Sequence, residues 1–256
     1  MKDTQAYIES LTLADGLRTG ITTRSRSLED PSEPVPLPIA PAVVNVGSLV
    51  SFVSGLDPQE MRDVLSTVQL AQRGASGSYN RFTDTPKWYN KYIEILGTVG
   101  WVGEQLAFAE YQQSAGHLEM DKAALEVIAA VATSQQLQAL TTCLGALRKL
   151  SSGDQPITLF ELNSLAQSSG NFQLGTVQKA PANGALTMGL GAFYFSASRQ
   201  QGKFLFFSWG DRETRLWTAV QKLTLDPDIY VPLRSQIAQK LGAEGPHYVS
   251  ALTLSP

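Results

Sequence analysis

Few residues in this sequence have side chains that could act together as nucleophiles, general bases or metal ligands. The chain has one cysteine, Cys143, and two histidines, His117 and His247. One cysteine cannot form an internal disulfide, and the three residues are too few for the usual zinc cage. A histidine can act as a pH trigger, but both histidines lie in turn-like or strand-edge contexts, where a surface position is the commoner explanation. We therefore predict no metal ion.

Two patterns that could hold a phosphate group or a metal ion are incomplete. Gly189 and Gly191, in MGLGAF, lack the third glycine and the following helix of a dinucleotide-binding loop. Asp226 and Asp228 flank a proline at an expected helix start, where capping explains both carboxylates. The chain has no paired carboxylates and no nucleophile elbow. We therefore predict that the protein is not an enzyme, has no catalytic residues and uses no cofactor.

Cys143 has a second interpretation, as a site for lipid. It shares an expected helix face with Leu140 and Leu144, and a small buried hydrophobe is the default interpretation of such a cysteine. The alternative is acylation, which adds about 0.8 kcal/mol of membrane affinity per buried methylene. Cys143, Leu140 and Leu144 are therefore the candidate acylation site or lipid pocket.

The composition is that of an ordinary folded protein and argues against a nucleic-acid partner. Of 256 residues, 43% are hydrophobic and 17% are charged, which favours one domain. A net charge of −3 and a pI near 5.5 provide no basic surface for nucleic acid. The start has no apolar core of a signal peptide, and no apolar run approaches the length of a spanning helix. We expect a protein made soluble in the cytoplasm, and released if it acts on target-cell membranes.

The central element of the predicted fold is an apolar stretch at residues 183–209, which we expect to form a β-hairpin. In the first arm, residues 185–198, both alternating sets of side chains are apolar, and the second arm, residues 204–209, repeats this pattern. A sheet exposed to water on one face would alternate apolar and charged residues. The arms should therefore be central strands, covered on both faces.

Helices that could cover these strands are predicted before and after them. Start signals and apolar spacing predict helices at residues 57–74, 85–100, 121–150 (a helical hairpin with Asp121 as N-cap) and 226–241, with a weaker helix at 41–53. Further strands are expected at residues 7–13, 101–112 (an edge strand), 157–162, 171–179, 215–225 and 248–254. The order indicates an α+β fold with an antiparallel sheet.

Residues 1–41 are expected to form an N-terminal arm on a single domain that spans residues 1–256. Five prolines between Pro31 and Pro41 predict an extended strap. Arg24 and Arg26 precede the strap in chain that we expect to be accessible, where proteases commonly cut. These two arginines are the candidate sites of protease activation.

The order of elements resembles the cytolytic delta-endotoxin (Cyt-like) fold family of membrane-active toxins and virulence factors. The resemblance lies in ALEVIAAVATSQQLQALTTCLGALRKL at residues 124–150, GNFQLGTVQKAPANGALTMGLGAF at 170–193, KFLFFSW at 203–209 and the helix at 227–242. It covers roughly half of the chain and includes no specific motif. It implies three layers, a central antiparallel sheet wrapped on both faces by helix hairpins, and permeabilisation of membranes after helices move away from the sheet. Proteolytic trimming activates members of that family.

The resemblance implies membrane lipid as the partner and a homo-oligomer on the membrane. A transmembrane strand needs about 9–11 tilted residues, which the first arm provides, although a buried central strand explains the same pattern. The candidate membrane-insertion residues are Leu186, Met188, Leu190, Phe193, Phe195, Phe204, Phe206, Phe207 and Trp209.

Three alternatives stay open. Trp88, Tyr89, Tyr92 and Trp101 are either an interfacial aromatic set or core packing. The chain could also be a lipid-binding or small-ligand-binding module that never inserts, with a pocket between helices and sheet. An enzyme of unrecognised type is the third alternative, and a cleft that holds an acid with a strongly perturbed pKa would support it.

Overall fold

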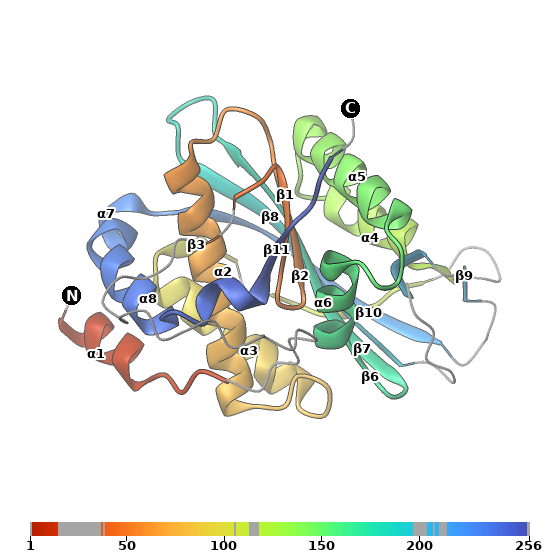
Figure 1. The fold of residues 1–256 in the computed structure, drawn as a ribbon, viewed down its shortest axis with the longest axis horizontal. Coiled ribbons are helices and arrows are strands. Elements are labelled where there is room, and N and C mark those ends of the chain that lie inside the picture. Colours follow the sequence, from red (N-terminus) through yellow and green to blue (C-terminus); the bar gives the residue numbers. More distant parts are fainter. Residues whose placement is uncertain are drawn as a thin grey trace.

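A computed structural model describes residues 2–14, 37, 39–104, 106–112, 118–196, 204–206, 208–209 and 214–254. The main sheet has the strand order β11-β1-β2-β7-β8-β10-β3, with β4 paired to β10 and β6 paired to β7 (Figure 1). Its strands are β1 (Ala42–Asn45), β2 (Ser48–Phe52), β3 (Trp101–Gly103), β4 (Ala109–Glu110), β6 (Leu165–Ala166), β7 (Ser169–Lys179), β8 (Leu186–Ser196), β10 (Arg215–Leu225) and β11 (Val249–Ala251). A separate pair joins β5 (Leu118–Glu119) to β9 (Ser208–Trp209).

The helices come from both halves of the chain, so the fold is mixed α and β. The α-helices are α1 (Lys2–Ser10), α2 (Pro58–Ser78), α3 (Thr85–Thr98), α4 (Met120–Ala129), α5 (Ser134–Lys149), α6 (Gln155–Ser164), α7 (Pro227–Tyr230) and α8 (Arg234–Leu241). Short 3₁₀ helices are η1 (Phe204–Phe206), η2 (Val231–Leu233) and η3 (Gly245–Tyr248). In Figure 1, α2 and α3 lie to one side of the long strands, and α4 and α5 lie to the other.

The centre of the sheet is made by the three longest strands. β8 pairs antiparallel with β7 along their whole lengths and with β10 on its other edge. β2, however, pairs parallel with β7, so the expectation of a wholly antiparallel sheet is wrong at this one pair. A parallel pair needs a long crossover connection, and the chain from α2 to α6 provides it.

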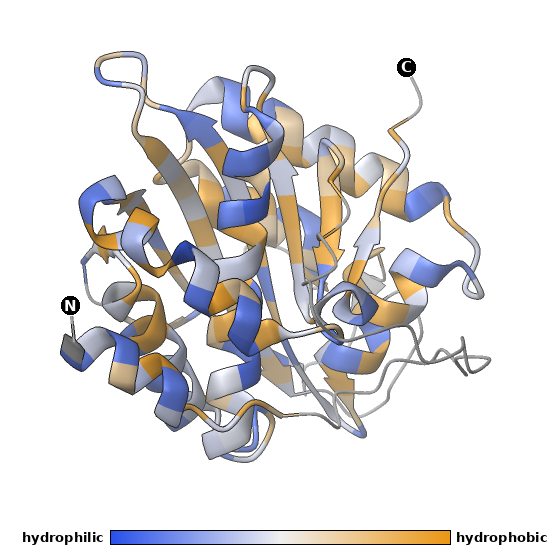
Figure 2. Cartoon of the chain, turned by 60° about the vertical axis from the view of Figure 1, so that its left-hand side comes forward, coloured by the Kyte–Doolittle hydropathy of each residue, from blue (hydrophilic) through white to orange (hydrophobic). Residues whose placement is uncertain are grey.

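The apolar side chains of β8 divide between two buried cores, as the alternating pattern predicted. Leu186, Met188 and Leu190 belong to a cluster that includes side chains of α2, α3 and α8, which we call the first core. Phe193 and Phe195 belong to a cluster with α4, α5 and α6, which we call the second core. Figure 2 shows hydrophobic residues along the strands and hydrophilic residues on the outer turns of the helices.

The helix start predicted at residue 57 is confirmed by its cap. Asp57 caps α2 by accepting hydrogen bonds at 2.9 Å from the backbone N–H groups of Gln59 and Glu60, and Glu60 closes the capping box. The predicted end of this helix at Gly74 is wrong, since α2 continues to Ser78. A Cβ atom at Gly74 would lie 2.7 Å from Cδ1 of Ile95, so this glycine allows α2 and α3 to pack closely.

Two secondary-structure predictions are wrong because an apolar run alone does not distinguish a buried helix from a buried strand. The predicted helix at residues 41–53 is the β1–β2 hairpin, whose valine-rich strands are buried on both faces. The predicted strand at 157–162 is α6, which has Pro156 in its first turn after Asp154. Proline in the first turn favours a helix because its φ angle suits that position.

Two predictions near the helices also need correction. Residues 7–13 are not a strand: α1 occupies residues 2–10, and Ile8 is buried in the first core. Asp121 is not an N-cap, because α4 already begins at Met120. The Asp121 carboxylate instead forms an ion pair with Arg148 of α5 and joins the two helices of the predicted hairpin.

The second arm of the predicted hairpin does not pair with the first. Residues 204–206 form η1, and β9 pairs with β5 instead of β8. Both edges of β8 are already occupied by β7 and β10, and β10 matches the strand predicted at 215–225. The predicted edge strand at 101–112 is reduced to β3, which ends the sheet order, and β4.

Candidate functional site

The candidate insertion residues of β8 are all buried in this conformation. Met188 and Phe193 have no exposed surface, and Leu186, Leu190 and Phe195 are at most 8% exposed. Phe193 stacks on Phe172 of β7, with ring centroids 4.9 Å apart. Contact of these residues with a lipid would therefore require the covering helices to move.

The candidates of the second arm lie elsewhere. Phe206 is partly buried against the second core, with the guanidinium carbon of Arg148 5.0 Å from the centre of its ring. Phe204 lies in η1 and Trp209 in β9, whereas Phe207 lies outside the described residues. The membrane role of all these residues stays a prediction.

The α4–α5 helix pair covers the second core and has a few polar contacts with the sheet. The Gln136 side chain donates hydrogen bonds to the carbonyl oxygens of Thr176, at 2.9 Å, and Thr187, at 3.4 Å. The Thr176 hydroxyl donates back to the Gln136 carbonyl at 2.9 Å. Thr133, the N-cap of α5, donates to the Gln178 side chain at 2.8 Å. These contacts form a small clamp at one end of the helix pair.

The opposite face of the sheet is joined to the α2–α3 pair by a buried polar network. Arg81, in the turn between the helices, donates to the Asn171 carbonyl oxygen at 3.0 Å. Tyr89 of α3 donates to the Asn171 side chain at 2.7 Å and accepts a hydrogen bond from Gln173 at 2.8 Å. Burial lowers the pKa of Arg81 to about 10, and its guanidinium lies 4.7 Å from the Trp88 ring.

The aromatic residues of this region are packed inside the protein. Trp88, Tyr89, Tyr92 and Trp101 are at most 2% exposed and belong to the first core. Trp88 stacks on Tyr92 with centroids 5.3 Å apart. In this conformation the core-packing interpretation is therefore correct.

Cys143 lies on the buried face of α5 with Leu140 and Leu144, as expected. Its thiol is free and has no exposed surface, and burial raises its pKa above the usual value. Because a thiolate is the reactive form, Cys143 is unreactive while α5 is in place. Its acylation stays a prediction.

The remaining candidates are not part of a common site. Arg24, Arg26 and His117 lie outside the described residues. His247 lies in η3 and is partly exposed. Gly189 and Gly191 lie in the middle of β8, so they form no phosphate loop.

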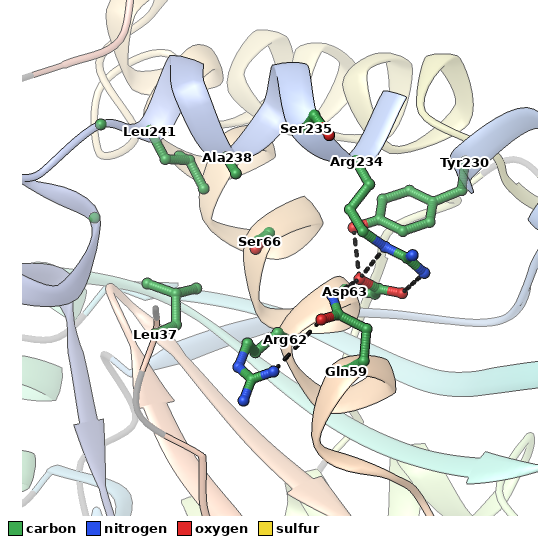
Figure 3. A pocket seen from close by; sticks show the side chains of 12 residues that line it. Leu37, Gln59, Arg62, Asp63, Ser66, Tyr230, Arg234, Ser235, Ala238 and Leu241 are labelled. Carbon is green, nitrogen blue, oxygen red and sulfur yellow. Dashed lines mark hydrogen bonds and ion pairs between the residues drawn. The ribbon is translucent and has the colours of Figure 1, made fainter. Parts of the chain in front are cut away.

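A cavity of about 310 Å³ lies between α2 and the C-terminal helices (Figure 3). It opens to the surface at the side of the first core, away from the α4–α5 pair. Its walls are Gln59, Arg62, Asp63 and Ser66 of α2, Leu37, and the residues Tyr230, Arg234, Ser235, Ala238, Leu241, Gly242 and Gly245. A cavity of this size can hold a small ligand.

Asp63 is the charged centre of this cavity and is almost fully buried. Arg234 donates two hydrogen bonds to its carboxylate, at 2.9 and 2.7 Å, Tyr230 donates one at 3.0 Å and Gln59 one at 2.8 Å. Burial and the nearby Asp63 raise the pKa of Tyr230, and the hydrogen bond to Asp63 raises that of Arg234. At neutral pH Tyr230 is therefore a neutral donor and Arg234 a cation.

No pattern in the sequence predicted this cavity. Its one local signal is that charged Arg62 and Asp63 directly precede the buried Val64 of an amphipathic helix. The partner of Asp63, Arg234, lies 171 residues further along the chain, and no pattern within one helix reveals such a pair.

A second cavity, of about 370 Å³, lies beside α3 and is lined mostly by apolar side chains, including Ile93, Leu106 and Phe108. Within the described ranges no group of three or more His, Cys, Asp or Glu side chains could hold a metal ion. Nor is any helix in this part of the chain long and apolar enough to cross a bilayer.

Comparisons with known proteins give a likeness in structure only. No protein-family model matches the sequence, and no curated protein matches it. A solved delta-endotoxin is similar in structure, with a TM-score of 0.45 and 14% identity over 80% of this chain and 96% of the endotoxin. The structure of the Evf virulence factor is also similar, with a TM-score of 0.39 and 10% identity over 94% of this chain and 89% of that one.

Proposed function

We propose that this chain is a non-enzymatic, toxin-like protein that binds lipid membranes and permeabilises them after a helix pair moves away from its sheet. The observation that supports it most is β8, which is 11 residues long and apolar on both faces. A strand that crosses a bilayer needs about 9–11 residues at a tilt near 45°. In this proposal, the helices and the sheet act as three layers, and the outer layers are detachable covers.

The α4–α5 pair is the cover that we expect to move. Its polar contacts with the sheet centre on the clamp of Gln136 and Thr133. The α2–α3 pair is instead held by the network around Arg81, which carries a buried charge. The network joins Arg81 and Tyr89 to the sheet by more hydrogen bonds than the clamp provides, and all of them must be given up before the α2–α3 pair can move. Release of the α4–α5 pair would expose the Phe193 face of β8.

Membrane lipid and further copies of the chain are the expected partners. Within a bilayer, every backbone N–H and C=O group must find a partner in the protein. If the long strands insert, their exposed sheet edges would remain unpaired unless neighbouring copies join them. A homo-oligomer on the membrane would satisfy these groups.

The test is release of a dye from liposomes, combined with a disulfide that holds the α4–α5 pair on the sheet. A Cβ atom at Gly189 would lie 3.6 Å from Cβ of Ala132, in the loop between α4 and α5. This separation is within the range of a disulfide, so we choose the double variant Ala132→Cys/Gly189→Cys. We expect dye release by the wild type, little release by the oxidised variant, and recovery after reduction.

The control experiments test the disulfide, the proteolytic activation and the helix movement separately. Each single cysteine variant should release dye with or without reductant, because it cannot form the disulfide. Trypsin treatment tests activation at Arg24 and Arg26. If micromolar wild-type protein leaves liposomes intact with and without trypsin, permeabilisation is wrong. If the oxidised double variant releases dye like the wild type, movement of the α4–α5 pair is wrong.

A further inference from the structure

The cavity between α2 and α8 has one more positive than negative charge among its lining residues. The lining includes two guanidinium groups, those of Arg62 and Arg234, and a single carboxylate, that of Asp63. The Asp63 carboxylate already accepts four hydrogen bonds, two of them from Arg234. It therefore has little capacity left for a cation or for Arg62.

Of the two arginines that line the cavity, Arg234 pairs with Asp63, whereas Arg62 has no ion pair among the described residues. Its only described hydrogen bond joins Nη1 to the side-chain oxygen of Gln59, at 3.4 Å. Its Nε atom is buried and has no hydrogen-bond partner. A buried donor without a partner is costly, so a ligand that accepts from Arg62 would gain a strong, charge-assisted hydrogen bond.

The other groups around the cavity favour the same kind of ligand. The hydroxyl groups of Ser66 and Ser235 lie on opposite walls (Figure 3) and can donate to oxygen atoms. The Gln59 side chain donates a hydrogen bond to Asp63 and accepts one from Arg62, so it links the two charged side chains. The cavity thus has hydrogen-bond donors to spare and an excess of positive charge, which suits a ligand with anionic oxygen atoms.

The rest of the wall is apolar, with Leu37, Ala238 and Leu241 facing the polar residues. An inorganic anion would leave this part of the cavity empty. A phosphate ester fills both halves, with its oxygen atoms on Arg62 and its carbon part against the leucines.

We propose that this cavity binds the phosphate group of a phosphate ester, with Arg62 as the principal ligand and the Arg234–Asp63 pair as its rigid floor. The same chemistry is offered by a phospholipid headgroup and by a free phosphate ester. The lipid source rests on the proposed function, whereas binding of a free ester does not.

Isothermal titration with two soluble probes distinguishes these sources. The probes are glycerol 3-phosphate and a short-chain phosphatidylglycerol below its micelle concentration. Binding of both, or of the lipid alone, assigns a headgroup site, and binding of glycerol 3-phosphate alone assigns a site for free phosphate esters. Absence of heat with both probes at millimolar concentration overturns the proposal.

Two variants connect the binding to the cavity. Arg62→Gln should weaken binding at least tenfold, and Ser66→Leu, which fills the cavity, should abolish it. The matched control is Lys87→Gln, which removes one positive charge from the exposed side of α3 and should bind like the wild type. Thermal unfolding by circular dichroism checks that each variant is folded. Equal weakening by Lys87→Gln, or unchanged binding by folded Arg62→Gln, would overturn the proposal.

Liposome leakage is measured on the same variants, so the two proposals fail separately. If the probes do not bind and dye is still released, the phosphate site is wrong and the membrane function stands. If the probes bind and no dye is released, the site stands and the membrane function is wrong.

Discussion

Gly191 shows how closely the α4 helix approaches the sheet. A Cβ atom at this position would lie 2.7 Å from Cγ1 of Ile128 and 2.7 Å from the ring of Phe193. Neither neighbour has free space, because both are fully buried in the second core. The glycine therefore permits the contact between α4 and β8 that keeps the Phe193 face covered.

We expect Gly191→Ala to lower the free energy of unfolding by about 1–3 kcal/mol, because the added methyl group overpacks the contact between α4 and β8. Urea unfolding measures the change. The matched control is Gly145→Ala in α5, where a Cβ atom meets nothing within 4 Å. In a helix interior this substitution should stabilise by about 0.5–1 kcal/mol. Stabilisation by both variants would show that α4 can move away from β8 without cost.

Buried tyrosines should make the fold sensitive to alkaline pH. Burial raises the pKa of Tyr89 above its value of 10.0 in solvent, and burial together with Asp63 raises that of Tyr230. An unfolded tyrosine loses its proton near pH 10, whereas the folded protein keeps these hydroxyls neutral. The contribution of these buried tyrosines to the free energy of unfolding is therefore fully present below about pH 10 and is lost as the pH rises above that value.

The measurement is the urea midpoint between about pH 8 and pH 11. Tyr89→Phe should be less stable at neutral pH but should lose less stability above pH 10 than the wild type. Tyr79→Phe, on an exposed ring, should follow the wild-type curve. If Tyr89→Phe also follows the wild-type curve, the Tyr89 hydroxyl does not contribute to the alkaline loss.

At the scale of elements, the two helix pairs are joined to the sheet in different ways. The α4–α5 pair is held by apolar contacts and by the Gln136 clamp, which bonds to β7 and β8. The α2–α3 pair is held by a buried network that includes Arg81 and Asn171. The clamp consists of neutral groups near one end of its helix, so its removal should weaken one cover while the other stays in place.

We expect Gln136→Leu to lower the free energy of unfolding by about 1–3 kcal/mol, because it removes the hydrogen bonds to two carbonyl oxygens and the N-terminal capping box. Under the proposed function it should also speed dye release. The control Gln135→Leu changes an exposed neighbour in the same helical turn and should alter stability by less than about 0.5 kcal/mol. A Gln136→Leu protein that is less stable but releases dye no faster would separate the clamp from the opening step.

In the complete fold, one sheet contributes side chains to both cores. Alternate residues of β8 point into the first and the second core, so loss of the sheet would expose both. The N-terminal part of the chain joins the same sheet through β1 and β2, and the C-terminal β11 pairs with β1. Neither core can therefore lose its sheet face independently.

Two core variants test this coupling. Leu65→Ala removes side-chain volume from the first core and Phe193→Ala from the second. We expect losses of about 2–5 and 3–5 kcal/mol respectively, each with one cooperative transition. Far-ultraviolet circular dichroism and tryptophan fluorescence should give the same midpoint. Separate midpoints for the two probes in either variant would show that the cores unfold independently.

Local patterns in the sequence were sufficient to predict those features whose cause lies within one helix or strand. The helix start predicted at residue 57 agrees with the structure because the hydrogen bonds of its cap, Asp57, reach only two or three residues ahead. The pattern of β8 showed that both of its faces are buried, because alternation along a strand is a local property. The predicted β10 agrees with the structure for the same reason.

Which elements pair with one another depends on contacts between segments that are far apart in the sequence. The residues at 204–209 are as apolar as a central strand, but β10 takes the place beside β8 that they were expected to fill. The valine-rich residues at 41–53 suit a buried helix or a buried strand, and pairing with β7 and β11 makes them strands. The Asp63–Arg234 pair and its cavity likewise depend on contacts between distant segments. Local spacing sets which side chains share a face, whereas strand pairing and ion pairs depend on free-energy gains between residues that no short window contains.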